Sequence, residues 1–519
     1  MSPSATKNVS RVPMILLGIL AGLQAADPLV CSLSLVKASD ELNFSASLQS
    51  LAAGISTFAL AATVIPAGLL ADRAGRRRVL SWAVLVAAAG QVMTALGPDP
   101  AVFLAGRIIT GVALGAVFSS AYAMIQHIVA PEDRAPAIAL FSVVAIIFPL
   151  LVVVASGPVA GLNWRLAYGI LPLVAVVVFP LIVRLLPEVE SVGSGPVDYL
   201  GLVLVAVGVA GLLVGISSAS RGLGSPFFWG PIAGGVVALI WFARHGSVIA
   251  NPLFPPKIFT HPAFFAAVLF GILFNFVNGA SSQMSANFWQ YVTRMPTALV
   301  GMASVPVAIF SVIAASIAGR LLKKGTPGWL LAGVGGLVAA VGIGSLVIVG
   351  ATSPYALFLP MMALCGLGSA AVSVVQGGMF LNLSPAKYFG PVTSVRTAVG
   401  QFGYSLGLTG TSVLVSTFTL GGVARIGKGA SGDDNNWDAI TSFLTTGQTT
   451  DTSLSSLGRE AIAGAYAQAF ALTAAISAVL LALMAAIAIW ALRRPTASLN
   501  MDAFVGDAAV PTPAKENPR

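Results

Sequence analysis

The sequence predicts an all-α integral membrane protein with fourteen transmembrane helices. Three observations support this prediction: 57% of the 519 residues are hydrophobic, only 9% are charged, and the mean hydropathy is +0.91. A soluble domain needs a more polar surface than this composition supplies, so the chain must lie in lipid. About 20 apolar residues in a helix cross a bilayer core about 30 Å thick, so uncharged runs of that length can be counted as spans.

Fourteen such runs follow one another along the chain. They are roughly 13–36, 47–71, 79–97, 101–126, 137–161, 166–186, 198–217, 226–243, 263–287, 298–321, 329–350, 355–381, 391–418 and 464–491. The first run follows Lys7 and Arg11, as a signal peptide does, but it is about 24 residues long and lacks a small-residue cleavage site. It is therefore expected to be a retained helix.

The runs form two blocks of six helices with two helices between them. Linkers that contain Pro, Gly and mixed charge, at 187–201 and 243–264, mark the two boundaries. We therefore predict an N-terminal bundle over 1–190, two inserted helices over 191–245, and a C-terminal bundle over 246–494. The two six-helix bundles are expected to be pseudo-repeats, as in many transporters of this size.

Two polar segments lie outside these spans. The segment 421–461 is rich in Gly, Ser, Thr and Asp, and is expected to be a mobile, solvated loop on the outer side. The tail 495–519 is expected to be disordered in the cytoplasm.

The basic residues are sorted by side of the membrane. With the N-terminus in the cytoplasm, 18 of the 27 Lys and Arg residues fall on the inner side and 7 on the outer side, while Arg107 and Arg396 lie within helices. This bias is what the positive-inside rule predicts for an even number of spans, so both termini are expected inside. Membrane topology thus explains the net charge of +9, and no nucleic-acid partner is expected.

Asp27 is the one acidic residue, among 18, that falls deep within a predicted span. A carboxylate near mid-membrane costs about 2.5 to 3.5 kcal/mol on insertion scales, so its position indicates a function. Arg107 is the matching cation, because a rise of about 1.5 Å per residue places the two at similar depths below the outer helix ends. We expect the two to pair and Asp27 to exchange a proton; a salt bridge that only fixes helix packing is the alternative.

The stretch GLLADRAGRRRVL at 68–80 concentrates five charges between two apolar runs. It must reverse the chain in about six residues, and glycine supplies the conformational freedom for such a turn. A weaker copy, GRLLKKGT, begins 251 residues later at Gly319, and the same offset places Asn278 opposite Asp27. The residues expected to form a gating loop are Gly68, Asp72, Arg73, Gly75, Arg76 and Arg77. A solvated turn at the inner face is the alternative.

These features resemble the fourteen-helix drug:proton antiporter branch of the major facilitator superfamily. The 68–77 loop matches the family's motif between helices two and three, and Arg107 with Gly111 and Gly115 matches its helix-four motif. SGPVAG at 156–161 is a degenerate form of its helix-five motif, with Gly157, Pro158 and Gly161 present and an earlier glycine missing. The resemblance implies alternating access, a gating role for the loop, and proton coupling through Asp27 and Arg107 in a bacterial cytoplasmic membrane.

Polar side chains in the second block indicate a substrate path. Amides in a membrane helix are expected to face protein or a water-filled cavity, although interhelical packing is the alternative. The residues in question are Asn275, Asn278, Ser282, Gln283, Asn287, Gln376, Met379, Gln401 and Tyr404.

The predicted function is export of lipophilic or monocationic compounds in exchange for protons, with no other cofactor. Export of an endogenous lipid or metabolite by the same machinery stays open, as does a non-transporting sensor or assembly partner. No catalytic residues or metal ligands are expected, because Cys31 and Cys365 lack partner spacing and no catalytic motif occurs. We expect a monomer surrounded by membrane lipid.

Overall fold

A computed structural model describes residues 11–129, 134–188, 198–218, 224–249, 262–382, 389–426, 437–449 and 451–493. Within these ranges the chain is almost entirely helical and contains no strand. Fourteen of the described segments are long and apolar enough to cross a membrane. The predicted fold class is therefore confirmed. Helices suit lipid because each one satisfies its own backbone hydrogen bonds.

The first six spans form the N-terminal bundle. Its helices are α1 (Arg11–Leu42), α2 (Ala46–Ala74), α3 (Arg76–Leu96), α4 (Pro100–Ile128), α5 (Arg134–Leu162), α6 (Trp164–Ala167) and α7 (Ile170–Leu185). Polar side chains begin several of these helices, where the first backbone N–H groups lack a helical partner. Asp99 accepts from the backbone N–H of Val102 at 3.0 Å, and Ser45 caps α2 in the same way.

The last six spans form the C-terminal bundle. Its elements are α11 (Pro262–Tyr291), α12 (Thr297–Ala303), α13 (Val305–Lys323), α14 (Gly328–Gly344), η3 (Ser345–Ile348), η4 (Tyr355–Phe358), α15 (Leu359–Asn382), α16 (Phe389–Ile426), α17 (Trp437–Thr446), α18 (Thr452–Leu457) and α19 (Arg459–Leu492). We call the contact surface between the two bundles the seam. The outer end is the end where α1 finishes and α2 begins, which topology predicts to face outside.

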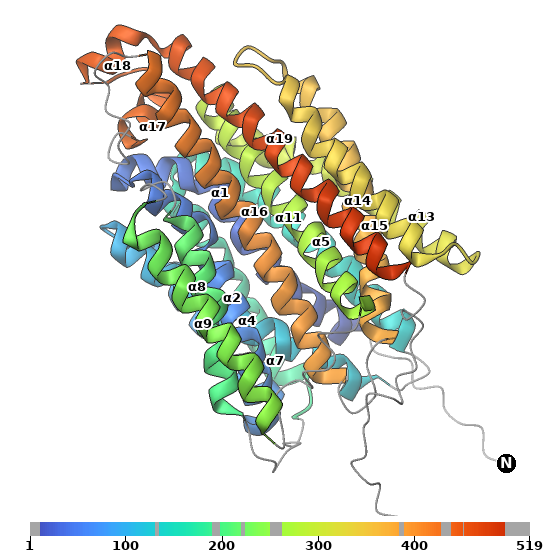
Figure 1. The fold of residues 1–519 in the computed structure, drawn as a ribbon. Helices are drawn as coiled ribbons and strands as arrows, with labels where there is room; N and C mark the ends of the chain where they lie inside the picture. The colour runs from blue at the N-terminus through green and yellow to red at the C-terminus, as the bar shows by residue number, and fades with distance from the viewer. Residues whose placement is uncertain are drawn as a thin grey trace, which may run out of the picture.

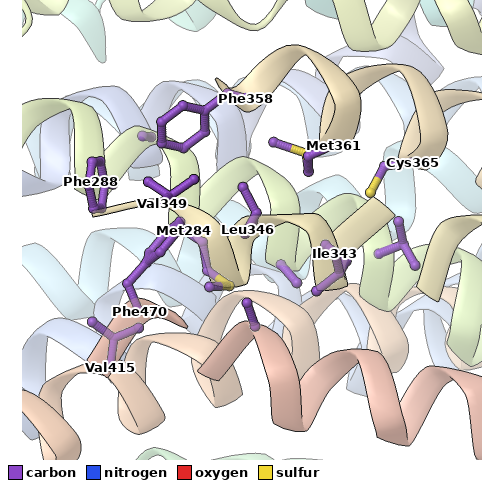
Figure 2. Packing of buried hydrophobic residues seen from close by; sticks show 14 of the residues in the cluster. Met284, Phe288, Ile343, Leu346, Val349, Phe358, Met361, Cys365, Val415 and Phe470 are labelled. Carbon is purple, nitrogen blue, oxygen red and sulfur yellow. The ribbon is translucent and has the colours of Figure 1, made fainter. Parts of the chain in front are cut away.

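Each bundle has its own packed core. One hydrophobic cluster lies mainly in α1 to α7, and a second lies mainly in α11 to α19. In the second cluster, Phe288 of α11 packs on Phe470 of α19 and Phe358 of η4, with ring centroids 4.7 and 5.5 Å apart (Figure 2). Separate cores let the two bundles move as units.

The inserted helices α8 (Tyr199–Ser217) and α9 (Pro226–Val248) pair with each other on one side of the molecule, next to α2 (Figure 1). Leu213 of α8 is fully buried, and it packs with Ile55 and Phe58 of α2 and with Phe402 of α16. Because α8 touches both bundles, the inserted pair covers the seam between α2 and α16.

The expectation of a mobile, solvated loop over 421–461 is wrong where the segment is described. α17 and α18 lie within it, at one end of the bundle (Figure 1), and the described residues on either side continue α16 and begin α19. Trp437, Ile440 and Leu444 on α17 are at most 3% exposed. Their spacing places them on one helix face, which packs on the protein. Residues 427–436 and the predicted tail 495–519 lie outside the described residues.

Candidate functional site

The Asp27 carboxylate is enclosed by the N-terminal bundle and is 1% exposed. The Ser56 hydroxyl of α2 donates to Oδ2 at 2.7 Å, and the Gln91 amide of α3 donates to Oδ1. Arg107 of α4 donates from Nη1 to the same Oδ1 and forms an ion pair with Asp27. Three neighbouring helices therefore each contribute one donor to a single carboxylate. The structure thus brings Asp27 and Arg107 together as expected, while their role in proton coupling stays a prediction.

Two facing glycines bring α3 and α4 close enough for this arrangement. A Cβ added at Gly106 would lie 2.7 Å from the carbonyl oxygen of Gly90, and one at Gly90 would lie 2.9 Å from that of Gly106. The two helices therefore touch backbone to backbone, as small residues allow in membranes. Gln91 and Arg107 directly follow these glycines, so the crossing places their side chains beside the same carboxylate.

A second close crossing joins α2 to α4. A Cβ at Gly111 would overlap the carbonyl oxygen of Ser56, and one at Gly115 would lie 2.9 Å from the hydroxyl of Thr63. These are the two glycines of the helix-four motif. They set how closely α2, which carries Ser56, approaches α4, which carries Arg107.

Arg107 is a fully buried cation with few partners. Its side chain is 0% exposed, and Nε and Nη2 have no hydrogen-bond partner among the described residues. Its guanidinium carbon lies 5.8 Å from the centroid of the Tyr168 ring, within cation–π range. Asp27 is thus the anion that compensates this charge, and removing one member of such a pair leaves the other buried and unpaired.

One residue of the predicted substrate path, in the other bundle, interacts electrostatically with this site. Tyr404 of α16 lies within electrostatic range of the Asp27 carboxylate. A Cβ at Gly279 of α11 would overlap the Tyr404 carbonyl oxygen, so α11 and α16 are in backbone contact at this level.

The other residues of the predicted path do not gather in one place. Gln283 and Asn287 of α11 hydrogen-bond to each other at 3.2 Å and line a cavity near the outer end. Asn275 and Asn278 instead donate to carbonyl oxygens of their own helix at 2.9 Å, and Ser282 is half-buried. The cavity thus includes two of these five residues.

The path residues on α15 and α16 do not line this cavity. Gln376 accepts a hydrogen bond from Arg396 at 3.1 Å, and Met379 packs against both hydrophobic clusters. Gln401 is 8% exposed, and its Oε1 has no hydrogen-bond partner among the described atoms.

Hydrogen bonds cross the seam at the outer end. Ser32 of α1 contacts Gln283 at 2.8 Å, and Gln290 donates to the backbone oxygen of Ser32 at 3.3 Å. Ser32 and Gln283 are 251 residues apart, which equals the offset of the predicted repeat. The repeat register itself stays a prediction. Gln49 of α2 also crosses the seam, where it donates to the Tyr291 hydroxyl.

Gly75 makes the tight turn of the 68–77 loop. It lies between α2 and α3 with φ at +95°, a region that favours glycine, and its N–H donates to the Ala71 oxygen at 3.1 Å. Arg77 forms an ion pair with Glu188 at 3.0 Å, and Arg73 donates to the Tyr199 hydroxyl at 3.3 Å. The described contacts therefore join the loop to the end of α7 and the start of α8.

Two other residues of the predicted loop lie in the helices on either side of the turn. Gly68 lies within α2, and Arg76 begins α3 and is half-buried. The side chain of Asp72 lies outside the described part of the structure. The gating role of the loop stays a prediction.

The helix-five motif lies at a close crossing between the bundles. A Cβ at Gly157 would lie 2.9 Å from the carbonyl oxygen of Ala298 in α12, and one at Gly161 would lie 3.8 Å from the backbone nitrogen of the same residue. From the other side, a Cβ at Gly301 would lie 2.7 Å from the Val153 oxygen. Pro158, between the two motif glycines, is exposed. The motif thus lets α5 and α12 approach closely across the seam.

Residues 15–408 match the family model described as the Major Facilitator Superfamily. The chain belongs to this superfamily. Membership agrees with the fourteen candidate membrane spans, and the resemblance noted in its motifs is confirmed at the level of the superfamily.

Several bacterial relatives share about a quarter of their residues with the chain. An uncharacterized transporter of Mycobacterium tuberculosis is 26% identical over 280 residues, which cover 52% of this chain and only 40% of that protein. The multidrug efflux pump LfrA of Mycolicibacterium smegmatis is 26% identical over 438 residues, with 80% of this chain and 83% of the pump covered. The puromycin resistance protein pur8 of Streptomyces alboniger is 26% identical over 384 residues, covering 71% and 73%.

Solved structures show the same fold. A bacterial homologue of the human lysosomal transporter Spinster, in an inward-facing and unoccupied conformation, matches with a TM-score of 0.66 at 18% identity, covering 98% of this chain and 100% of that one. This likeness concerns the arrangement of the helices alone.

Proposed function

We propose that the protein exports lipophilic or monocationic compounds across a bacterial cytoplasmic membrane in exchange for protons. The observation that carries this proposal is Asp27, a carboxylate in a membrane helix that is 1% exposed and paired with a buried arginine. Ionisable residues in such positions are costly and mark proton or substrate pathways in transporters. The names of two relatives, a multidrug efflux pump and a puromycin resistance protein, support an export function.

The position of Asp27 constrains how coupling works. Ser56, Gln91 and Arg107 all belong to the N-terminal bundle, so a rigid rotation of one bundle against the other leaves these contacts unchanged. We propose that proton exchange includes a rearrangement inside that bundle. Pro28 directly follows Asp27 within α1 and cannot donate a backbone hydrogen bond. The helix therefore lacks one backbone hydrogen bond beside Asp27, which makes it easier to bend there.

The charge balance follows from a single coupling carboxylate. Exchange of one proton for one monovalent cation is electroneutral and is driven by the pH gradient alone. Export of a neutral compound also uses the membrane voltage, at about 2.3 kcal/mol per charge per 100 mV. Divalent cations are not expected as substrates.

A proton-flux assay in liposomes tests the proposal. Compounds that raise the unfolding temperature of the purified protein are selected first, with tetraphenylphosphonium included as a lipophilic monovalent cation. The reconstituted protein should move protons when a selected compound is added, and Asp27→Asn should abolish that movement. Asp40→Asn is the matched control, because it removes an exposed carboxylate from the same helix and should leave the flux intact. Undiminished flux in a folded Asp27→Asn protein would overturn the proposal.

A further inference from the structure

Gln49 connects the two bundles through both ends of its side-chain amide. It lies near the start of α2 at the outer end and is 4% exposed. Its Nε2 donates to the Tyr291 hydroxyl at the end of α11, and its Oε1 accepts from the indole Nε1 of Trp437 on α17. A single side chain of the N-terminal bundle thus holds two partners from the C-terminal bundle.

The helix α17 is fastened to the C-terminal bundle at its other end. The Leu444 oxygen in its last turn accepts from Nε of Arg294 at 3.1 Å and from Nε of Arg459 at 2.9 Å. Arg459 also donates to the Val292 oxygen at the end of α11 at 2.9 Å. Cations beside the last carbonyl groups of a helix are favourable, because that end carries partial negative charge. α17 is therefore expected to move with the C-terminal bundle.

Packing of the first turn of α17 agrees with this assignment. The Trp437 ring stacks on Tyr466 of α19, with centroids 6.5 Å apart and an interplanar angle of 24°. Both rings line the cavity that contains Gln283 and Asn287. α17 thus forms part of the outer wall of that cavity.

We propose that α17 is a lid over the outer end of the transporter and that Gln49 is the latch that holds this lid to the N-terminal bundle. When the bundles separate at the outer end, the bonds from Gln49 to Tyr291 and Trp437 break and water reaches the cavity. When they close, the same bonds reform. This inference rests on alternating access and is independent of proton coupling.

Uncharged hydrogen bonds suit a latch that must open in every cycle. A neutral hydrogen bond exchanges with bonds to water, so each one shifts an equilibrium by only about twofold to tenfold. Loss of the Trp437 bond should therefore raise the population of the open outer end by about that factor.

Cysteine labelling measures this population. Ser412 lines the cavity on α16 and is half-buried, so Ser412→Cys is a reporter for a membrane-impermeant maleimide added outside intact cells. The native Cys31 and Cys365 are each 1% exposed, and the protein without the reporter gives their background labelling.

In the reporter protein, Trp437→Phe removes the indole N–H and retains an aromatic ring. We expect it to raise the labelling rate about twofold to tenfold. Gln49→Leu should raise the labelling rate at least as much. Adding Trp437→Phe to Gln49→Leu should not raise the rate further, because Gln49 Oε1, which accepts the Trp437 hydrogen bond, is already absent. Tyr466→Phe is the matched control, since it changes the same aromatic cluster without touching Gln49, and it should leave the rate unchanged.

Three results would overturn the latch. The first is an unchanged rate in Trp437→Phe and Gln49→Leu. The second is a full further increase when Trp437→Phe is added to Gln49→Leu. The third is an equal increase in Tyr466→Phe, which would mean that the cluster has only loosened. The unfolding temperature of each variant, measured alongside, identifies misfolded protein, and for any misfolded variant Tyr291→Phe replaces it as a test of the same latch. Because labelling needs neither substrate nor a proton gradient, its outcome does not depend on the proposed antiport.

Discussion

The buried pair of Asp27 and Arg107 predicts an asymmetry between two substitutions. A carboxyl group left without its cation can become neutral by binding a proton, whereas a guanidinium stays charged at any pH that a protein tolerates. In Asp27→Asn, Arg107 therefore remains as a cation in a site where it is 0% exposed. In Arg107→Met, Asp27 keeps its donors Ser56 and Gln91 and can also take up a proton.

The expected magnitudes follow from these remaining partners. Leaving a buried charge unpaired costs about 3 to 5 kcal/mol, and in Asp27→Asn only neutral groups, the new amide oxygen and the Tyr168 ring 5.8 Å away, remain to offset the charge of Arg107. Arg107→Met should lower the free energy of unfolding by about 1 to 3 kcal/mol, because a buried polar group loses one hydrogen-bond partner. The double variant has no charged side chain at these two positions, so it should be more stable than Asp27→Asn alone.

Thermal unfolding of the purified variants in one detergent at pH 7 ranks these free energies. The expected order of unfolding temperature is the unsubstituted protein first, then Arg107→Met, then Asp27→Asn, with the double variant above Asp27→Asn. If Asp27→Asn were as stable as Arg107→Met, or if the losses simply added in the double variant, the pair could not be the isolated buried ion pair described here.

Two further predictions concern glycines, and both are measured as unfolding temperatures. Gly106→Ala places a Cβ 2.6 Å from the Thr94 nitrogen and 2.7 Å from the Gly90 oxygen, so it should cost about 1 to 3 kcal/mol by pushing α3 from α4. Gly234→Ala on α9, with no described atom within 4 Å, should instead be neutral or stabilising, and equal effects would contradict the close crossing. Gly75→Ala forces an alanine to φ +95° and should lower the free energy of unfolding by about 1 to 3 kcal/mol. Gly464→Ala within α19, where a Cβ would meet no described atom within 4 Å, should leave the free energy of unfolding unchanged.

The spans and the central ion pair could be predicted from the sequence because lipid makes charge rare. Uncharged runs of about 20 residues stand out in such a chain, and Asp27 and Arg107 stand out as charges within them. Their similar depths sufficed to predict contact. The same scarcity argument does not apply to neutral polar groups, which occur throughout membrane helices.

Ser56 and Gln91 were missed for that reason. Each is an ordinary polar residue in an apolar run, and only the crossing of Gly90 and Gly106 shows that Gln91 faces Asp27. A signal for α17 did exist, since Trp437, Ile440 and Leu444 recur at helical spacing. The polar composition around them concealed it. The partners of Gln49 lie 242 and 388 residues away, and nothing local in the sequence indicates them.

The bonds that close the outer end join uncharged groups: Ser32 with Gln283 and Gln290, and Gln49 with Tyr291 and Trp437. Dissolved ions screen attractions between charges over about 8 to 10 Å at ordinary ionic strength, but they leave neutral hydrogen bonds almost untouched. The closed state of the outer end should therefore be about equally stable at low and at high salt concentration.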